Sequence, residues 1–333
     1  MKLSRRAVLT LPAAFPGCRA SRERTVRLAS GSSFDTINQL PIIVARELGY
    51  FRDQGISVNI DVMTSSPLAM QALLGGSVDV ITAPFELLLP LRAENRKVRS
   101  FLLMETVPLE VFVVSPAHNG RIRRLLDLKG AVIGVSSPGS PMHMEVNYML
   151  KHAGVEAREF SIVGLGSNSS RVAALEAGKV DAAVLPDPGA TLLQQRHPDL
   201  VVLADTRTRE GMREAFGFEA YPGGVLVASE KWLGQNRDAA RATAAAVLKA
   251  MRWIADTPPA QVTMRIPRQY RMADDNMYSE CIERFVPSLS PKGIMPPELP
   301  RRVMDVLAAF DQKVAAANIN LEEAYTNEYL PPS

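Results

Sequence analysis

Two distant stretches of the chain follow the same local plan. In each, a helical pattern ends at glycine, a strand begins at a Val-Asp pair, a short apolar run follows, and a proline precedes the next helix. The two copies are residues 68–84 and 175–188. Repetition of one such unit predicts two related α/β lobes, each built around its own sheet.

Short apolar runs alternate with helical patterns in the first part of the chain. We expect strands at residues 25–29, 56–60 and 77–84, and helices at 41–48 and 68–74. This order is typical of a mainly parallel sheet with helices on both faces. Asp79 and Asp181 begin the repeated strands, and we interpret both as structural because open α/β sheets bind ligands at the opposite, carboxyl ends of their strands.

The remaining elements suggest how the two lobes are connected. Another strand is expected at residues 225–228, followed by helices at 238–255, 272–284 and 297–317. If that strand joins the first sheet, the second lobe is an insertion. Lobe I is then residues 25–114 plus 222–333, and lobe II is residues 115–221. The chain would cross between the lobes twice, which makes a hinge.

Residues 1–18 have the pattern of a secretory signal peptide, with a basic start, a short apolar segment and small residues. Arg5 and Arg6 resemble a twin-arginine export motif. Gly17 and Cys18 match the end of a bacterial lipoprotein box, which leaves lipidation at Cys18 open. We therefore expect a periplasmic protein, or one anchored on the extracytoplasmic side of a membrane if Cys18 is lipidated.

Composition excludes several classes of function. The chain has 333 residues and a net charge of +3, and Lys2, Arg5 and Arg6 of the leader supply that excess. No basic patch with interleaved aromatic residues supports nucleic-acid binding. Only Cys18 and Cys281 are cysteines, and the four histidines are not clustered with them at ligand spacing. We expect no metal site and no cofactor.

The best candidate for a ligand-binding element is the segment around residues 127–141. An apolar strand at 131–135 runs into a loop of small residues, and Ser140 before Pro141 has the pattern of a helix start. Free backbone N–H groups at a helix start favour an anionic or strongly polar group. The hydroxyls of Ser136, Ser137 and Ser140 add donors, so this loop is predicted to hold a solute.

A second polar loop, residues 164–169, has the first two glycines of a dinucleotide fingerprint but lacks the third. We therefore do not expect nucleotide binding here. A helix is expected to begin around Ser170, and the loop is predicted to form a second wall of the same small-molecule site.

Four motifs in order carry a resemblance to a known family. They are Glu47-Leu48-Gly49-Tyr50-Phe51 with Gly55-Ile56, the Gly-Ser-Val-Asp-Val unit at 76–80, Asp127-Leu128-Lys129-Gly130 with Ile133-Gly134-Val135, and Ala177-Gly178-Lys179-Val180-Asp181-Ala182. From about residue 25 to 233 the chain resembles the substrate-binding proteins of ABC importers, in the group for nitrate, alkanesulfonates, taurine and thiamine precursors. The resemblance implies a type II periplasmic-binding-protein fold, with two α/β lobes of mixed, mainly parallel sheets that close on a small organic solute.

The resemblance also implies which positions contact the solute, and these lie in loops that follow strands. They are Ser32, Ser33, Phe34, Ser65, Ser66, Ala83, Pro84, Phe85, Ser136, Ser137, Gly139, Ser140 and Asp187. Phe34, Phe85 and Tyr221 are candidates for stacking on the solute, and for Phe34 and Phe85 packing beneath the loop is the alternative. Glu105 and Glu110 flank the predicted crossing and are left open as ligand contacts or solvent-exposed groups.

The charge of the solute stays open. No arginine is evident in the predicted loops to pair with a sulfonate or nitrate, and Asp187 and Asp35 would repel an anion unless they face away. A zwitterion or a neutral heteroaromatic fits these residues nearly as well.

Two other classes of function remain as alternatives. One is an enzyme on the same scaffold, because a pyrimidine synthase resembles these binding proteins, although it relies on a cysteine-rich motif that this chain lacks. A serine hydrolase is also disfavoured, since Pro138 replaces the closing glycine of a nucleophile elbow at residues 134–138. The other is a ligand-sensing module for a membrane sensor. We predict instead a monomeric receptor with no catalytic residues, whose partner is an ABC permease.

Overall fold

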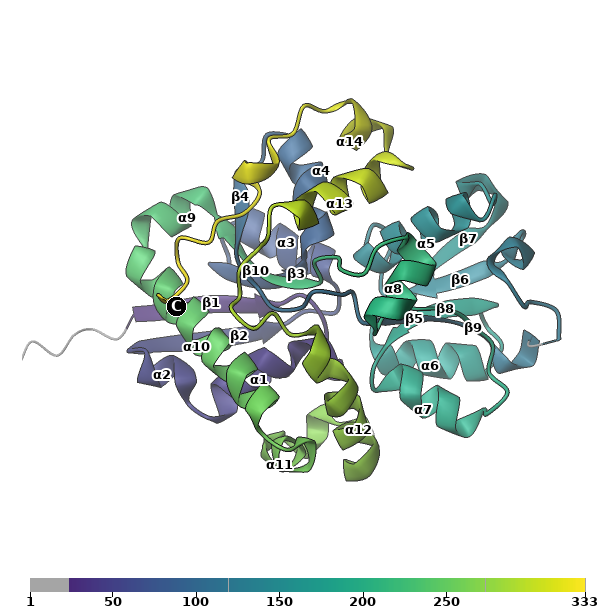
Figure 1. The fold of residues 1–333 in the computed structure, drawn as a ribbon, viewed down its shortest axis with the longest axis horizontal. Coiled ribbons are helices and arrows are strands. Elements are labelled where there is room, and N and C mark those ends of the chain that lie inside the picture. The colour runs from purple at the N-terminus through teal and green to yellow at the C-terminus, as the bar shows by residue number, and fades with distance from the viewer. Residues whose placement is uncertain (1–23, 119, 273, 333) are drawn as a thin grey trace, which may run out of the picture.

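The computed structural model describes residues 24–118, 120–272 and 274–332 and arranges them around two five-stranded sheets (Figure 1). The predicted leader, with Cys18 and the proposed lipidation, lies outside the described residues. Cys281 is buried and unpaired. None of the described helices is long and apolar enough to cross a bilayer.

The first sheet, which we take as the centre of lobe I, has the strand order β2-β1-β3-β10-β4. Strands β1 and β2 pair in parallel, as do β1 and β3, whereas β10 is antiparallel to both of its neighbours. The strands are β1 (Arg24–Ser30), β2 (Ile56–Val62), β3 (Val80–Pro84), β4 (Val98–Leu103) and β10 (Gly224–Ser229).

The second sheet, the centre of lobe II, repeats this pattern in the order β7-β6-β8-β5-β9. Three parallel strands are again followed by an antiparallel one, so β3 and β8 occupy equivalent central positions. These are the two strands of the repeated sequence unit. The strands are β5 (Glu110–Val114), β6 (Val132–Val135), β7 (Ser161–Gly164), β8 (Ala182–Pro186) and β9 (Val202–Asp205).

The aspartates that begin the repeated strands join neighbouring strands in both sheets. Asp79 Oδ2 accepts a hydrogen bond of 2.9 Å from the backbone N–H of Arg27. Asp181 Oδ2 accepts one of 2.8 Å from the backbone N–H of Val132. Each carboxylate therefore fixes the amino end of its sheet, which confirms the structural interpretation of both residues.

The chain passes from lobe I to lobe II after β4 and returns before β10. The sequence division ended the first part of lobe I at residue 114, but β5 is hydrogen-bonded in the second sheet, so that boundary is wrong by one strand. The pattern does not distinguish the β5 run from a strand of lobe I, because β5 is a short buried strand like β3 and β4. The first crossing therefore lies between Leu103 and Glu110, and the second between Phe216 and Gly224.

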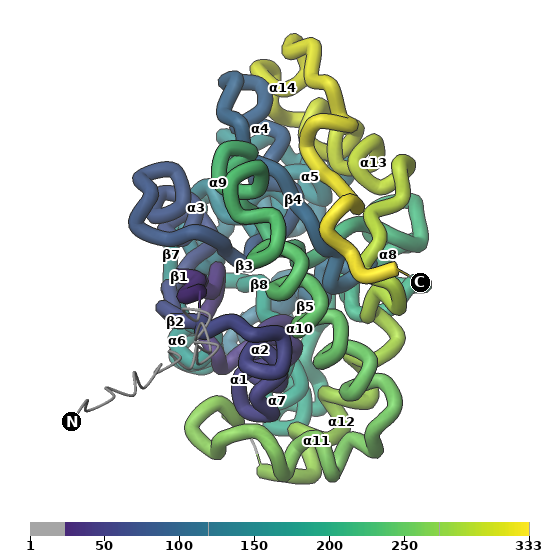
Figure 2. The backbone as a smooth tube through the Cα atoms, turned by 90° about the vertical axis from the view of Figure 1, so that its left-hand side faces the viewer, coloured from purple at the N-terminus to yellow at the C-terminus, as the bar shows by residue number. Residues whose placement is uncertain are grey.

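Helices cover both sheets, and the longest, α10, packs against α1 (Figure 2). The helix expected at residues 297–317 is in fact two, because the chain breaks between α13 and α14. The helices are α1 (Leu40–Glu47), α2 (Tyr50–Asp53), α3 (Ser66–Leu74), α4 (Leu88–Ala93), α5 (Pro141–His152), α6 (Asn168–Glu176), α7 (Gly189–Arg196), α8 (Arg209–Phe216), α9 (Glu230–Gln235), α10 (Arg237–Asp256), α11 (Pro259–Arg265), α12 (Asp275–Phe285), α13 (Glu298–Ala308) and α14 (Gln312–Ala316).

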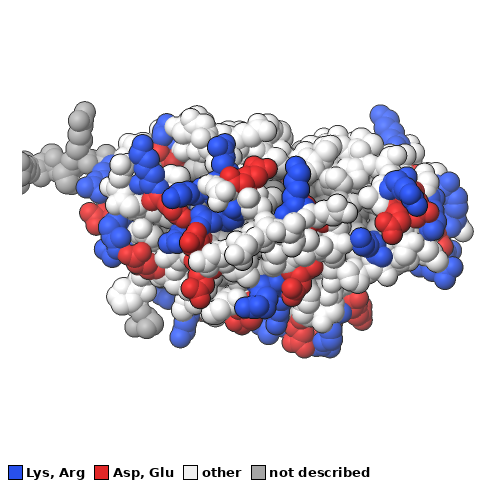
Figure 3. Space-filling model, turned by 90° about the horizontal axis from the view of Figure 1, so that it is seen from above, with Lys and Arg blue, Asp and Glu red and all other residues white. Residues whose placement is uncertain are grey.

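Charged side chains of both signs are interspersed on the face seen in Figure 3. That distribution agrees with the nearly balanced composition. It gives no support to a nucleic-acid surface on this face, since such a surface needs clustered basic residues.

Candidate functional site

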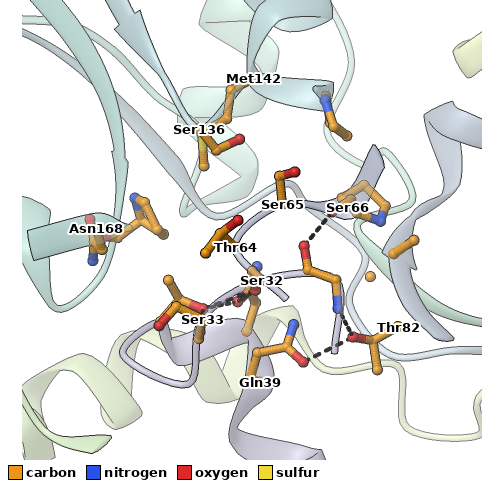
Figure 4. A pocket seen from close by; sticks show the side chains of 18 of the residues that line it. Ser32, Ser33, Gln39, Thr64, Ser65, Ser66, Thr82, Ser136, Met142 and Asn168 are labelled. Atoms are coloured by element: carbon orange, nitrogen blue, oxygen red, sulfur yellow. Dashed lines mark hydrogen bonds between the residues drawn. The ribbon is translucent and has the colours of Figure 1, made fainter. Parts of the chain in front are cut away.

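A cavity of about 50 Å³ lies between the two lobes, and side chains of both lobes line it (Figure 4). On the same scale a single water needs roughly 10–15 Å³, so the cavity has room for a small solute. In Figure 4, Ser136 and Met142 of lobe II lie across the cavity from Ser32 and Ser33 of lobe I. The carboxyl ends of β1, β3 and β6 lead into its wall, as expected for an open α/β sheet.

The lobe I wall is held together by a chain of buried hydrogen bonds around Gly31. Ser66 Oγ donates to the Gly31 carbonyl at 2.7 Å, and the Gly31 N–H donates to Thr82 Oγ1 at 2.9 Å. Thr82 Oγ1 in turn donates to Gln39 Oε1 at 3.0 Å. A Cβ atom at residue 31 would lie 2.0 Å from the Thr82 carbonyl oxygen, so only glycine fits this close approach.

Ser65 and Ser140 precede helices α3 and α5, but their hydroxyls differ in role. Ser140 Oγ accepts a hydrogen bond from the backbone N–H of His143, so it caps α5. Ser65 makes no such capping bond, although its backbone has the same extended conformation, and it lines the cavity. Ser65 therefore lines the cavity without capping its own helix.

The loop after β6 contributes less to the cavity than the sequence predicted. Ser136 lines it, together with Pro141 and Met142 at the start of α5. Gly139 adopts a left-handed conformation, with φ of +77°, and donates to His143 Nδ1. Ser137 Oγ is buried without a hydrogen-bond partner in the described residues and is not among the lining groups. Of the four positions predicted in this loop, Ser136, Ser137, Gly139 and Ser140, only Ser136 lines the cavity.

The predicted second wall is present, and it holds an arginine that the loop-based reasoning missed. Gly166, Ser167 and Asn168 line the cavity, and Arg171 follows them one turn into α6. Its guanidinium is buried and donates through one terminal nitrogen to the Gly166 carbonyl at 2.8 Å. Arg171 lies inside a helix, so a prediction based on loop residues does not include it. The helix expected from about Ser170 was the available signal, because it starts beside the predicted second wall.

Glu110 is the acidic counterpart of Arg171 in the cavity wall. Burial raises the pKa of Glu110 to about 8. The positive charge of Arg171 acts to lower this pKa, and the negative charge of Asp187 acts to raise it. Burial lowers the pKa of Arg171, while Glu110 and Asp35 act in the other direction. The sequence left Glu110 open between ligand and solvent, and the structure places it in the cavity lining.

Behind the cavity lies a cluster of buried acidic and phenolic groups, with Glu86 from lobe I and Glu145 from lobe II. Burial raises the pKa of Glu86 to about 8 and that of Glu145 well above its ordinary value. Tyr221 in the second crossing donates to Glu86 Oε1 at 2.7 Å. The cluster therefore connects both lobes and a crossing segment.

Three aromatic residues predicted as stacking candidates pack into the core instead of lining the cavity. Phe34 is 2% exposed and meets Tyr270 edge to face, with ring centroids 5.2 Å apart. Phe85 and Tyr221 are fully buried. Full burial of a large apolar ring contributes roughly 1.5–3 kcal/mol, which favours packing of these rings in the core.

Asp187 also lies away from the cavity lining, which corrects its assignment to the solute. Its carboxylate is buried, pairs with Arg207 at 3.1 Å and accepts from Thr191 Oγ1 at 2.7 Å. Its backbone carbonyl accepts a 2.9 Å hydrogen bond from the N–H of Ile37 in lobe I. Asp187 is thus neutralised within lobe II and contributes a contact between the lobes.

Seven of the predicted contact positions do line the cavity together. They are Ser32, Ser33, Ser65, Ser66, Ala83, Pro84 and Ser136. The described residues contain no group of three His, Cys, Asp or Glu side chains placed to hold a metal ion. The cavity therefore offers hydroxyl, amide, carboxyl and guanidinium groups for non-covalent binding.

Comparison with solved structures finds the same fold in other proteins. A structure of a protein from Bordetella bronchiseptica RB50 is 32% identical, with a TM-score of 0.86 over 92% of this chain and 96% of that one. The alkanesulfonate-binding protein SsuA from Xanthomonas axonopodis pv. citri, bound to MOPS, is 19% identical, with a TM-score of 0.68 over 92% and 99% of the two chains. The periplasmic nitrate-binding protein NrtA from Synechocystis PCC 6803 is 12% identical, with a TM-score of 0.69 over 92% and 87%.

These likenesses confirm the predicted periplasmic-binding-protein fold of two mixed α/β lobes. The family model described as NMT1/THI5 like matches residues 36–261, which include strands of both sheets and most of the cavity wall. The chain therefore belongs to the NMT1/THI5-like family.

Proposed function

We propose that this protein is an exported receptor that captures a small polar solute between its lobes and delivers it to an ABC permease. The observation that carries this proposal is the cavity itself, because its wall is built from both lobes and contains two buried ionisable side chains, Glu110 and Arg171. Two of the similar proteins named above are an alkanesulfonate-binding protein and a periplasmic nitrate-binding protein, and a periplasmic location goes with that role.

The proposed solute contacts are Ser32, Ser33, Ser65 and Ser66 from lobe I and Ser136, Asn168 and Arg171 from lobe II. A solute that touches both sets stabilises the closed arrangement through its greater affinity for that state. The division into lobes I and II, with the crossings as a hinge, is part of this proposal. We propose a monomer and no chemical change of the solute, so that a bound solute is recovered intact.

Binding measurements on one serine from each lobe test the proposal. Ser65→Ala and Ser136→Ala should each weaken solute binding, by about 5- to 30-fold if one hydrogen bond of roughly 1–2 kcal/mol is lost. Ser77→Ala is the control, since this exposed hydroxyl donates only to the Ala72 carbonyl. Affinities equal to that of the unmodified protein in both cavity variants would overturn the proposed binding site.

A further inference from the structure

Three buried glutamates from the two lobes meet behind the cavity. Glu86 lies in the 3₁₀ helix η2 (Phe85–Leu87) of lobe I, whereas Glu110 begins β5 and Glu145 lies in α5 of lobe II. Helix α13 of lobe I packs against both η2 and α5, which brings these elements together (Figure 1). All three residues have exposed fractions of 8% or less. The cluster therefore spans the boundary between the lobes.

The cluster offers few partners for negative charge. Glu110 Oε2 and Glu145 Oε2 are buried and have no hydrogen-bond partner within the described part of the chain. Glu86 Oε1 accepts one hydrogen bond, of 2.7 Å, from the Tyr221 hydroxyl. A buried carboxylate without partners is costly, and protonation removes its charge. The arrangement of the lobes in this structure therefore favours neutral, protonated carboxyl groups.

Burial accordingly shifts the titration of all three carboxyl groups. It raises the pKa of Glu86 and that of Glu110 to about 8, and it raises the pKa of Glu145 well above its ordinary value. The glutamates also act on one another. Negative charge on Glu110 raises the pKa of Glu86, and charge on either of these two raises the pKa of Glu145.

Other ionisable groups surround the cluster. Tyr221 and Tyr148 keep their protons near neutral pH, because burial raises their pKa values above the ordinary value of 10. Arg171 of α6 acts to lower the pKa of Glu110, and Asp187 after β8 acts to raise it. Asp305 of α13 acts on Tyr148. Arg171 is thus the one cation that these interactions bring to the three carboxyl groups in the described part of the chain.

We propose that opening of the cleft separates this cluster and releases its protons, so that acidic pH favours the closed form of the protein and rising pH favours the open form. This inference rests on the proposed hinge motion and concerns its control, not the identity of the solute. Opening moves Glu86 with lobe I and moves Glu110 and Glu145 with lobe II, and water reaches Glu110 because it lines the cavity. A carboxyl group that passes from a buried to a hydrated site returns toward its ordinary pKa of 4.5.

The direction of the effect follows from the raised pKa values. A carboxyl group with a pKa of about 8 in the closed form and 4.5 in the open form stabilises the closed form fully below pH 4.5. That contribution is lost as the pH rises to 8. Each such group lowers the ratio of closed to open protein by up to about tenfold per pH unit in this interval. Solute affinity should fall in the same way, since only the closed form holds the solute with both lobes.

The distance between two spin labels measures the lobe position without a solute. Val62 in β2 and Val163 in β7 are exposed, and their strands run parallel to β1 and β6, whose carboxyl ends lead to the cavity. Nitroxides on Val62→Cys and Val163→Cys, in a Cys18→Ser background, report open and closed populations by double electron–electron resonance. The ratio of closed to open protein should fall by about tenfold or more from pH 5.5 to 8.5. A ratio that pH does not change would overturn the inference.

Two variants assign the effect to the cluster. Glu145→Gln and Glu86→Gln each replace a titrating group by an amide of similar size that is neutral at every pH. In each variant the change in the ratio between pH 5.5 and 8.5 should be at least about threefold smaller. Glu280→Gln, at an exposed position on α12, is the matched control and should retain the full change. The full change in both folded cluster variants would contradict the assignment.

The receptor function is judged by a separate measurement. Solute binding that Ser65→Ala and Ser136→Ala weaken supports the receptor function whatever the spin labels show. If the labels show no response to pH while such binding is present, the inference on protons is wrong and the receptor function stands. A pH-dependent ratio with no effect of either serine variant on binding would contradict the receptor site and leave the proton-linked motion standing.

Discussion

The Tyr221 hydroxyl donates a 2.7 Å hydrogen bond to the Glu86 carboxyl, and both side chains are buried. Tyr221 belongs to the segment that returns from lobe II to lobe I, whereas Glu86 directly follows the central strand of lobe I. The contact thus ties a crossing segment to the sheet beneath the cavity.

Loss of this hydrogen bond should destabilise the protein. Tyr221→Phe leaves Glu86 buried without its donor, and we expect the free energy of unfolding to fall by about 1–3 kcal/mol. Denaturant unfolding at pH 7 measures the change. Glu86→Gln is the comparison, because an amide still accepts from Tyr221 and carries no charge, so its effect should be smaller. A Tyr221→Phe protein as stable as the parent would show that this bond does not support the crossing.

The buried carboxyls should make stability depend on pH. Burial raises the pKa values of Glu86 and Glu110 to about 8, above the ordinary value of 4.5, so the folded state binds these protons more tightly than the unfolded state. Their contribution to stability is complete below pH 4.5 and is lost as the pH rises toward 8. Unfolding free energies at pH 5.5 and 8.5 should differ less in Glu86→Gln than in the parent. The same difference in both proteins would exclude Glu86 as a source.

If the lobes close on the solute as proposed, contacts between them should contribute to apparent affinity. The Arg284 guanidinium in α12 of lobe I donates at 2.6 Å to Thr191 Oγ1 in α7 of lobe II. Arg284→Met removes this contact from the closed state, and a loss of about 1.4 kcal/mol would weaken solute binding tenfold. Arg268→Met, at an exposed position, is the control. Small-angle scattering should also show a larger radius for the Arg284 variant; an unchanged radius and affinity would exclude a role in closure.

The close approach at Gly31 should be intolerant of any side chain. Gly31→Ala would bring a Cβ to 2.0 Å from the Thr82 carbonyl oxygen, so the loop after β1 must shift, and the proposed solute contacts at Ser32 and Ser33 with it. We expect a lower melting temperature and at least tenfold weaker binding. Gly234→Ala is the matched control, because nothing lies within 4 Å of its Cβ on helix α9 and alanine favours a helix by roughly 0.5–1 kcal/mol. Normal binding by Gly31→Ala would refute the close-packing argument.

The repeated architecture could be predicted from the sequence because short stretches of neighbouring residues specify each copy of the unit. A glycine-ended helix followed by a Val-Asp strand start specifies the same unit wherever it occurs, and β3 and β8 indeed hold equivalent places in the two sheets. The serines that follow β1, β2 and β6 line the cavity for a related reason, since parallel strands direct their following loops to one edge.

The local sequence pattern does not predict whether a side chain faces the cavity or the core. Phe34 packs on Tyr270, a residue distant in sequence, and no motif near Phe34 indicates that contact. Arg171 lies inside a helix, outside the loops in which the sequence predicts ligand contacts, and for Glu110, at the start of a strand, the sequence leaves ligand contact and solvent exposure equally open. Their importance comes from burial and missing hydrogen-bond partners, which only the folded arrangement defines.

The most direct test of the account is thermal melting of the purified protein against a panel of solutes. The panel contains alkanesulfonates, taurine, β-alanine, nitrate, aminopyrimidines and riboflavin. A solute that binds only the folded state adds about 2.7 kcal/mol of stability at a hundredfold excess over its Kd, which raises the melting temperature measurably. The account predicts a saturable rise with one chemical class, and a loss of that rise in Ser65→Ala and Ser136→Ala. A melting temperature that no member of the panel changes would contradict it.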